Sequence, residues 1–96
     1  MRIVFEPAAF EEVREAIAWY LGKAGQRYAE ALNREIDAKL ALLVQHPAIG
    51  TPGANNVRRL PLRVFPYTLH YQVEGDAIRV FAVAHQRRRP EYWRKR

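Results

Sequence analysis

Apolar side chains recur every three or four positions over two stretches in the first half of the chain. In the first stretch the apolar positions are Phe10, Val13, Ile17, Tyr20 and Leu21. In the second stretch they are Tyr28, Leu32, Ile36, Leu40 and Leu43. This spacing is typical of helices with one apolar face, so the pattern predicts two helices that pack against each other as a hairpin.

Proline and glycine residues indicate where these helices begin and end. Pro7 fits the first turn of the first helix, where its missing N–H is not needed, and it separates that helix from a short strand over residues 2–5. Gly22 and Gly25 indicate a tight connection between the two helices. Pro47 ends the second helix.

The period changes to two in the second half of the chain. Residues 57–64 are predicted to be an extended segment, weakened by Pro61. Every odd position from 65 to 73 is apolar, which predicts a strand with one buried face. Glu74-Gly75-Asp76 predicts a hairpin turn. Residues 77–84 are apolar at nearly every position, as expected of a central strand covered on both faces.

These elements predict a single α+β domain over residues 1–96, with the order β-α-α-β-β-β. The last three strands are expected to form an antiparallel run. The N-terminal strand is expected to join the same antiparallel sheet, with the helical hairpin packed on it. A chain of 96 residues leaves room for one modest core, and no internal repeat or linker is visible.

The composition excludes several kinds of site. The sequence has no cysteine, which excludes disulfides and thiolate zinc sites. Its three histidines lack metal-ligand spacing, so neither a metal nor a cofactor is expected. The N-terminus lacks the apolar stretch of a signal peptide, and no run approaches the roughly 20 apolar residues that cross a bilayer. A cytoplasmic protein without membrane contact is therefore expected.

The positive charge of the chain belongs to its second half. The net charge is +6, but residues 1–47 carry seven acidic and six basic side chains, whereas residues 48–96 carry three acidic and ten basic ones. A basic surface attracts phosphate backbones or an acidic protein partner. A solvated surface without a partner is the alternative that charge alone leaves open.

A long motif in the second half is similar to one in a known toxin family. Residues 65–93 read FPYTLHYQVEGDAIRVFAVAHQRRRPEYW, and residues 58–64 extend the motif at its start. Two N-terminal features agree with it, namely Ala18-Trp19-Tyr20 within a helix and the sequence HPAIGTP over residues 46–52. Together these residues resemble toxins of the ParE/RelE superfamily, which belong to type II toxin–antitoxin modules and are often called plasmid-stabilisation proteins.

The resemblance implies one of two activities. ParE-like members poison DNA gyrase, whereas RelE-like members are endoribonucleases that cut messenger RNA on the ribosome. RelE-like nucleases commonly have a basic residue where this chain has Thr68. The resemblance is therefore closer to the ParE-like members, with ribosome-dependent RNA cleavage as the alternative.

Candidate site residues gather where the last strand ends. RNA cleavage by a 2′-hydroxyl needs an acid, a base and cations around the phosphate. Under the ribonuclease alternative the catalytic set is His85, Arg87, Arg89 and Tyr92. The residues expected to bind nucleic acid or another target are Arg59, Arg63, Arg87, Arg88, Arg89 and Trp93. Arg59 and Arg63 are expected to share one face of a neighbouring strand.

Each candidate also has a structural interpretation. A histidine at a strand end is often a hydrogen-bonded structural residue, which applies to His85. The arginine run from Arg87 to Arg89 is compatible with an electrostatic surface for a protein partner. Tyr92 and Trp93 can instead fold back and cap the core. The sequence leaves these alternatives open.

A protein partner is expected from the same features. A helical hairpin over a small sheet, with a basic second half, predicts an apolar groove bordered by cations. An acidic amphipathic segment would bury its apolar side there and place its carboxylates near the arginines. The resemblance implies that this segment is the C-terminal region of a cognate antitoxin.

Overall fold

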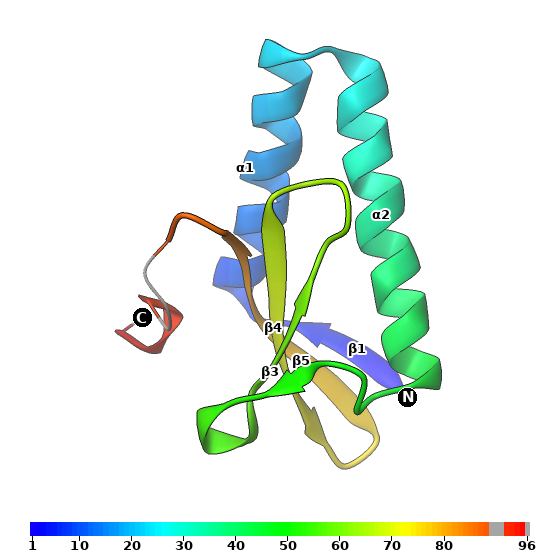
Figure 1. The fold of residues 1–96 in the computed structure, drawn as a ribbon, viewed down its shortest axis with the longest axis vertical. Helices are drawn as coiled ribbons and strands as arrows, with labels where there is room; N and C mark the ends of the chain where they lie inside the picture. The colour runs from blue at the N-terminus through cyan, green and yellow to red at the C-terminus, as the bar shows by residue number, and fades with distance from the viewer. Residues whose placement is uncertain (89–91, 96) are drawn as a thin grey trace.

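A computed structural model describes residues 1–88 and 92–95 of the chain (Figure 1). The helices are α1 (Pro7–Lys23) and α2 (Gln26–Gln45), with short 3-10 helices η1 (Ala54–Asn56) and η2 (Tyr92–Lys95). The strands are β1 (Arg2–Phe5), β2 (Thr51–Pro52), β3 (Arg58–Pro61), β4 (Tyr67–Glu74) and β5 (Ala77–His85). The predicted α+β class is confirmed.

The five strands form one mixed sheet in the order β1-β5-β4-β3-β2. β1 runs parallel to β5, with Phe5 beside Val80, and the remaining pairs are antiparallel. The expectation that the N-terminal strand joins an antiparallel sheet is therefore wrong. Alternation of apolar residues determines which face of a strand is buried, but it does not determine the direction of its neighbour.

α1 and α2 lie side by side as an antiparallel hairpin (Figure 1). The predicted boundaries hold, because α1 begins at Pro7, Gly25 has a positive φ of 95° before α2, and α2 ends at Gln45. The predicted α1 stripe is confirmed in part, because Val13, Ile17 and Tyr20 pack against the core, whereas Phe10 and Leu21 are exposed. The buried residues of α1 are Ala9 and Ala16, whose small side chains allow close packing on the sheet.

Two groups of buried residues form the core between the helices and the sheet. One contains Ala9, Leu43, Leu69, Tyr71, Ile78, Val80 and Val83. The other contains Ala16, Leu32, Ile36, Leu62 and Phe65. Both combine residues of the helical hairpin with residues from the β3–β5 region, so the hairpin and the sheet are stabilised by one continuous apolar layer.

A β-bulge in the β4–β5 pair changes which side chains face away from the helices. Tyr71 pairs with Val80 and His70 pairs with Ala82, which leaves Phe81 as the extra residue. Val80 and Val83 both belong to the core, so alternation places Phe81 and Ala82 together on the opposite face. Residues far along the chain cover part of that face, as described below.

The segment predicted to be extended over residues 57–64 is shorter in the structure. β3 ends at Pro61, and residues 62–66 form a loop. The carboxylate of Glu35 on α2 accepts hydrogen bonds from the backbone N–H groups of Arg63, Val64 and Phe65. The expectation that Arg63 shares a strand face with Arg59 is therefore wrong, because Arg63 lies in this loop.

Candidate functional site

The candidate residues lie around the C-terminal end of β5. His85 is the last residue of β5, Arg87 and Arg88 follow in an exposed turn, and Trp93 lies on η2. Arg89, which the sequence assigned to both candidate sets, lies outside the described residues. The site is thus formed by a strand end and two segments that come directly after it.

His85 is half-buried against β4. Its ring lies edge-on to the ring of Tyr67, the residue opposite it in the sheet, with ring centroids 5.3 Å apart. Its Nδ1 atom accepts a hydrogen bond from the backbone N–H of Arg87 at 3.1 Å. Accepting at Nδ1 places the proton of the neutral ring on Nε2. In this arrangement Nδ1 is engaged by the backbone, and Nε2 of the neutral ring is left as a hydrogen-bond donor.

Tyr92 contacts α1 through its hydroxyl. Its hydroxyl donates a hydrogen bond to one carboxylate oxygen of Glu12, and the other oxygen accepts from the backbone N–H of Val83 at 3.0 Å. The pairing of β1 with β5 ends at Val80, so the N–H of Val83 has no partner on β1. Glu12 accepts its hydrogen bond instead. Sequence reasoning missed Glu12, because its two partners are 71 and 80 positions away.

Trp93 folds back onto the face of the sheet opposite the helices. Its ring stacks on Phe81 with centroids 5.5 Å apart and an angle of 16° between the planes. The ring of His70 is also close, at 5.8 Å between centroids. The indole Nε1 is buried and has no hydrogen-bond partner within residues 1–88 and 92–95. Trp93 thus folds back, as one interpretation expected, but it covers the outer face of the sheet and not the core between the sheet and the helices.

The described arginine candidates separate into those that line a cavity and those that do not. Arg59 lies opposite His70 in the β3–β4 pair, and the Arg88 guanidinium lies over the Tyr92 ring at 4.5 Å. Arg59 and Arg88 line one cavity of about 570 Å³, together with His85 and Trp93. Arg63 does not line it.

A second cavity, of about 390 Å³, lies between α1 and the end of β5. Its lining contains Glu12, Glu15, Trp19, Tyr20, Tyr67 and Arg88. Burial, and secondarily the nearby Tyr20, raise the pKa of Tyr67 above its ordinary value. Its phenol therefore stays protonated at neutral pH and can donate a hydrogen bond, but it does not act as a base.

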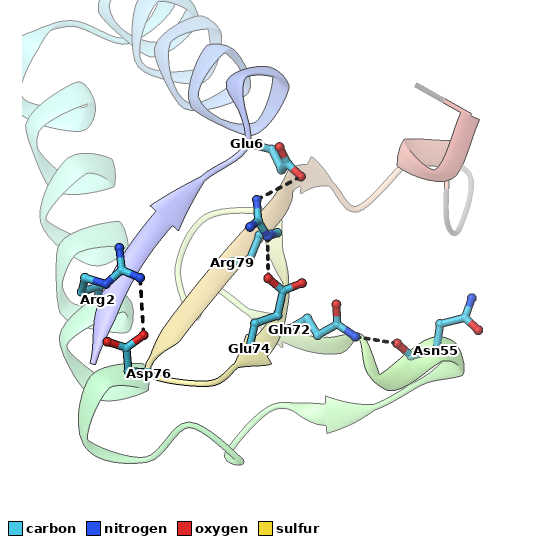
Figure 2. Close-up of polar contacts among 7 residues, drawn as sticks. All are labelled: Arg2, Glu6, Asn55, Gln72, Glu74, Asp76 and Arg79. Carbon is cyan, nitrogen blue, oxygen red and sulfur yellow. Dashed lines mark hydrogen bonds and ion pairs between the residues drawn. The ribbon is translucent and has the colours of Figure 1, made fainter.

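Figure 2 shows ion pairs of residues near β1 and β5, and the contact of the Gln72 amide on β4 with the backbone carbonyl of Asn55 on η1. Arg79 contacts the carboxylates of Glu74 at 2.9 Å and Glu6 at 3.6 Å. Arg2 pairs with Asp76 at 3.4 Å at the start of the parallel strand pair. Arg2 and Arg79 are thus paired with carboxylates, whereas Arg59 and Arg88 have no ion pair with any other described residue.

Residues 1–88 and 92–95 contain no group of three or more His, Cys, Asp or Glu side chains placed to hold a metal ion. Within the same residues, neither helix has the length and apolar character needed to span a membrane.

A family model described as the ParE toxin of the type II toxin–antitoxin system, parDE, matches residues 3–90. The fold is similar to a chain of the chromosomal ParDE system from P. aeruginosa, with a TM-score of 0.77, 19% identity, and coverage of 88% of this chain and 95% of that one.

Two E. coli structures are also similar. The intact RelBE toxin–antitoxin complex contains a chain with a TM-score of 0.60 and 24% identity, covering 91% of this chain and 98% of that one. The isolated RelE toxin has the same score and identity, with 98% and 93% covered. At these identities the likeness establishes the fold alone. No curated protein matches the sequence.

Proposed function

This chain belongs to the ParE toxin family of type II toxin–antitoxin systems, and we propose that it arrests growth by binding and poisoning DNA gyrase. In this proposal the toxin traps gyrase on DNA and contributes no catalytic residue of its own. A cognate antitoxin binds the toxin and neutralises it.

The contact between Tyr92 and Glu12 carries the proposal of binding without catalysis. A ribonuclease would need the Tyr92 hydroxyl near the scissile phosphate, but here a carboxylate of α1 engages it. His85 accepts a backbone N–H at Nδ1, and Thr68 offers no cation to a phosphate. Within residues 1–88 and 92–95, the Tyr92 hydroxyl and Nδ1 of His85 are therefore both engaged by the protein itself, whereas general acid–base catalysis requires groups that are available to the substrate.

The surface proposed to contact gyrase is the exposed turn after β5. Arg87 and Arg88 are both exposed there, on the half of the chain that carries the positive charge. Exposed cations of this kind accelerate association with an acidic or phosphate-bearing target and orient it on the surface.

The test is a gyrase assay with purified toxin. The wild-type protein is expected to inhibit supercoiling and to increase cleaved DNA held by gyrase. Arg87→Glu should weaken both effects, whereas Arg34→Glu, with the same change in charge on the exposed side of α2, should not. Gyrase that remains fully active at high molar excess of toxin would contradict the proposal. Cleavage of ribosome-bound messenger RNA instead would establish the alternative.

The antitoxin is proposed to contribute an acidic amphipathic segment. The similar structures belong to the ParDE system and to the RelBE toxin–antitoxin complex, which supports the same arrangement for this chain. The product of an adjacent small open reading frame is expected to co-purify with the toxin and to abolish gyrase inhibition. Separate elution at micromolar concentrations of both proteins would contradict this expectation.

A further inference from the structure

The cavity of about 390 Å³ between α1 and the end of β5 is lined largely by aromatic rings. The rings of Trp19 and Tyr20 meet at 79° with their centroids 4.9 Å apart, and those of Tyr20 and Tyr67 meet at 63° with their centroids 6.4 Å apart. Neighbouring rings at such steep angles form walls around a space instead of a flat stack. The volume lies within the range of sites that hold a small organic group.

One stripe of α1 supplies most of this lining. Its members are Glu12, Glu15, Ala16, Trp19 and Tyr20, which lie on one side of the helix because they are spaced by three or four positions. Ala16 is buried, and its small side chain leaves room between the carboxylates and the rings. Trp19 is 55% exposed, although tryptophan is highly buried on average, so its ring is open to a ligand.

The cavity is acidic, although the net charge of the whole chain is +6. Two carboxylates line it, those of Glu12 and Glu15, against the single guanidinium of Arg88. Glu15 makes no ion pair with any other residue in 1–88 or 92–95. A positive group in the cavity would therefore meet a carboxylate and aromatic rings together, and both attract cations.

The chain already holds one guanidinium against an aromatic ring beside this cavity. The Arg88 guanidinium lies over the Tyr92 ring at 4.5 Å, and the Tyr92 hydroxyl donates a hydrogen bond to Glu12. Tyr92 does not line the cavity, so this contact leaves the rings of Trp19, Tyr20 and Tyr67 uncovered. A second cation can contact those rings in the same way.

We propose that this cavity binds an organic cation, namely a guanidinium or ammonium group carried by a basic side chain of a polypeptide or by a free polyamine. The rings of Trp19 and Tyr20 contact the cation, and the carboxylate of Glu15 accepts its N–H groups. Such a group suits the site because it is attracted by ring faces and donates to a carboxylate at the same time. The proposal does not rest on gyrase as the target, and failure of either leaves the other intact.

The experiment uses the full-length toxin labelled with ¹⁵N. It is titrated with N-acetyl-arginine methylamide, the uncharged citrulline analogue of that compound, a short peptide with one arginine among glycines and serines, and spermidine. The indole signal of Trp19 is expected to move with the arginine compound and to saturate, and the citrulline analogue should bind about tenfold more weakly or not at all. Equal binding of the two compounds, or a Trp19 signal that no probe moves, would overturn the proposal.

The same titrations identify the source of the cation. Tighter binding of the peptide than of the capped arginine would assign the site to a basic side chain of a polypeptide. Equal or weaker binding of the peptide would assign it to a free cation of the polyamine class. Spermidine then gives the affinity for that class directly.

Glu15→Gln is expected to weaken binding of the capped arginine by about threefold to tenfold, because the carboxylate partner of the cation is lost. The matched control is Glu30→Gln, which makes the same change at an exposed position of α2 and should leave the affinity unchanged. Trp19→Leu keeps an apolar side chain but removes the ring, and calorimetry is expected to show a similar loss. Thermal unfolding verifies that each variant folds. Equal loss in Glu30→Gln, or unchanged affinity in both Glu15→Gln and Trp19→Leu, would also overturn the proposal.

Discussion

The hydroxyl of Tyr71 accepts a hydrogen bond from the backbone N–H of Gly50 at 2.8 Å and donates one to the carbonyl of Pro47 at 2.7 Å. Tyr71 is fully buried in β4, so its phenol fastens the segment after α2 to the centre of the sheet. Arg58 binds the same segment from β3, through the carbonyls of Ala48 and Gly50. The HPAIGTP motif is thus a structural connection.

Removal of this hydroxyl is expected to destabilise the protein. Tyr71→Phe leaves a buried N–H and a carbonyl without a partner, at a cost of about 1–3 kcal/mol in the free energy of unfolding. Urea denaturation measures the loss, and Tyr28→Phe, at a side chain that is 57% exposed, is the control. An unchanged midpoint in Tyr71→Phe would show that water replaces the hydroxyl.

Gly50→Ala tests the same connection from the other side. A Cβ at Gly50 would lie 2.6 Å from the Tyr71 hydroxyl and 2.7 Å from the ring, closer than such atoms approach in proteins. Because Tyr71 is buried and cannot move away, the free energy of unfolding is expected to fall by about 1–3 kcal/mol. Gly22→Ala is the control, since a Cβ there meets nothing within 4 Å. Equal midpoints for the two variants would contradict the expectation.

The loop over residues 62–66 is expected to depend on one carboxylate. Glu35→Ala removes the acceptor for three backbone N–H groups and should lower the free energy of unfolding by about 2 kcal/mol. Glu30→Ala, also on α2, loses an exposed contact with Gln26 and is expected to cost less than about 0.5 kcal/mol. Hydrogen exchange should also become faster at Val64. If exchange there is as slow as in the wild type, Glu35 does not hold the loop.

The two candidate activities predict opposite results for His85→Ala. Loss of an acid or base in a ribonuclease lowers the rate by about 100- to 10,000-fold. A toxin that acts by binding should keep its effect on gyrase within about threefold, provided that the variant folds. Gyrase inhibition, growth arrest and thermal unfolding measured on the same variant separate these cases. A large loss of growth arrest with an unchanged unfolding midpoint would favour the ribonuclease.

Local signals in the sequence are sufficient for the helices and the turns. Pro7 and Pro47 exclude the helical hydrogen bonds at the observed ends, and Gly75 adopts the positive φ of 57° that its hairpin turn requires. Such features act between neighbouring residues, so the pattern along the chain reports them directly. The boundaries of both helices were predictable for this reason.

The features that sequence reasoning missed depend on distant contacts. The parallel pairing of β1 with β5 joins residues about 75 positions apart, as for Arg2 and Ala77. The β-bulge at Phe81 could not be predicted, because residues 77–84 are apolar at nearly every position and show no alternation that a bulge would shift. Glu12 looks like any exposed acid of a helix until its partners Val83 and Tyr92 are placed beside it. The sequence therefore indicated that the candidate residues gather after β5, but it did not indicate the contacts that hold them there.

Ionisation of Tyr67 is expected to destabilise the protein at high pH. Its pKa is raised in the folded state above the ordinary value of 10.0, mainly by burial. The neutral phenol therefore stabilises the fold fully below about pH 10, and this contribution is lost as the pH rises through the higher folded pKa. In Tyr67→Phe the free energy of unfolding should fall less steeply above pH 10 than in the wild type. Tyr28→Phe, at an exposed position, should follow the wild type, and identical slopes for all three proteins would contradict a raised pKa at Tyr67.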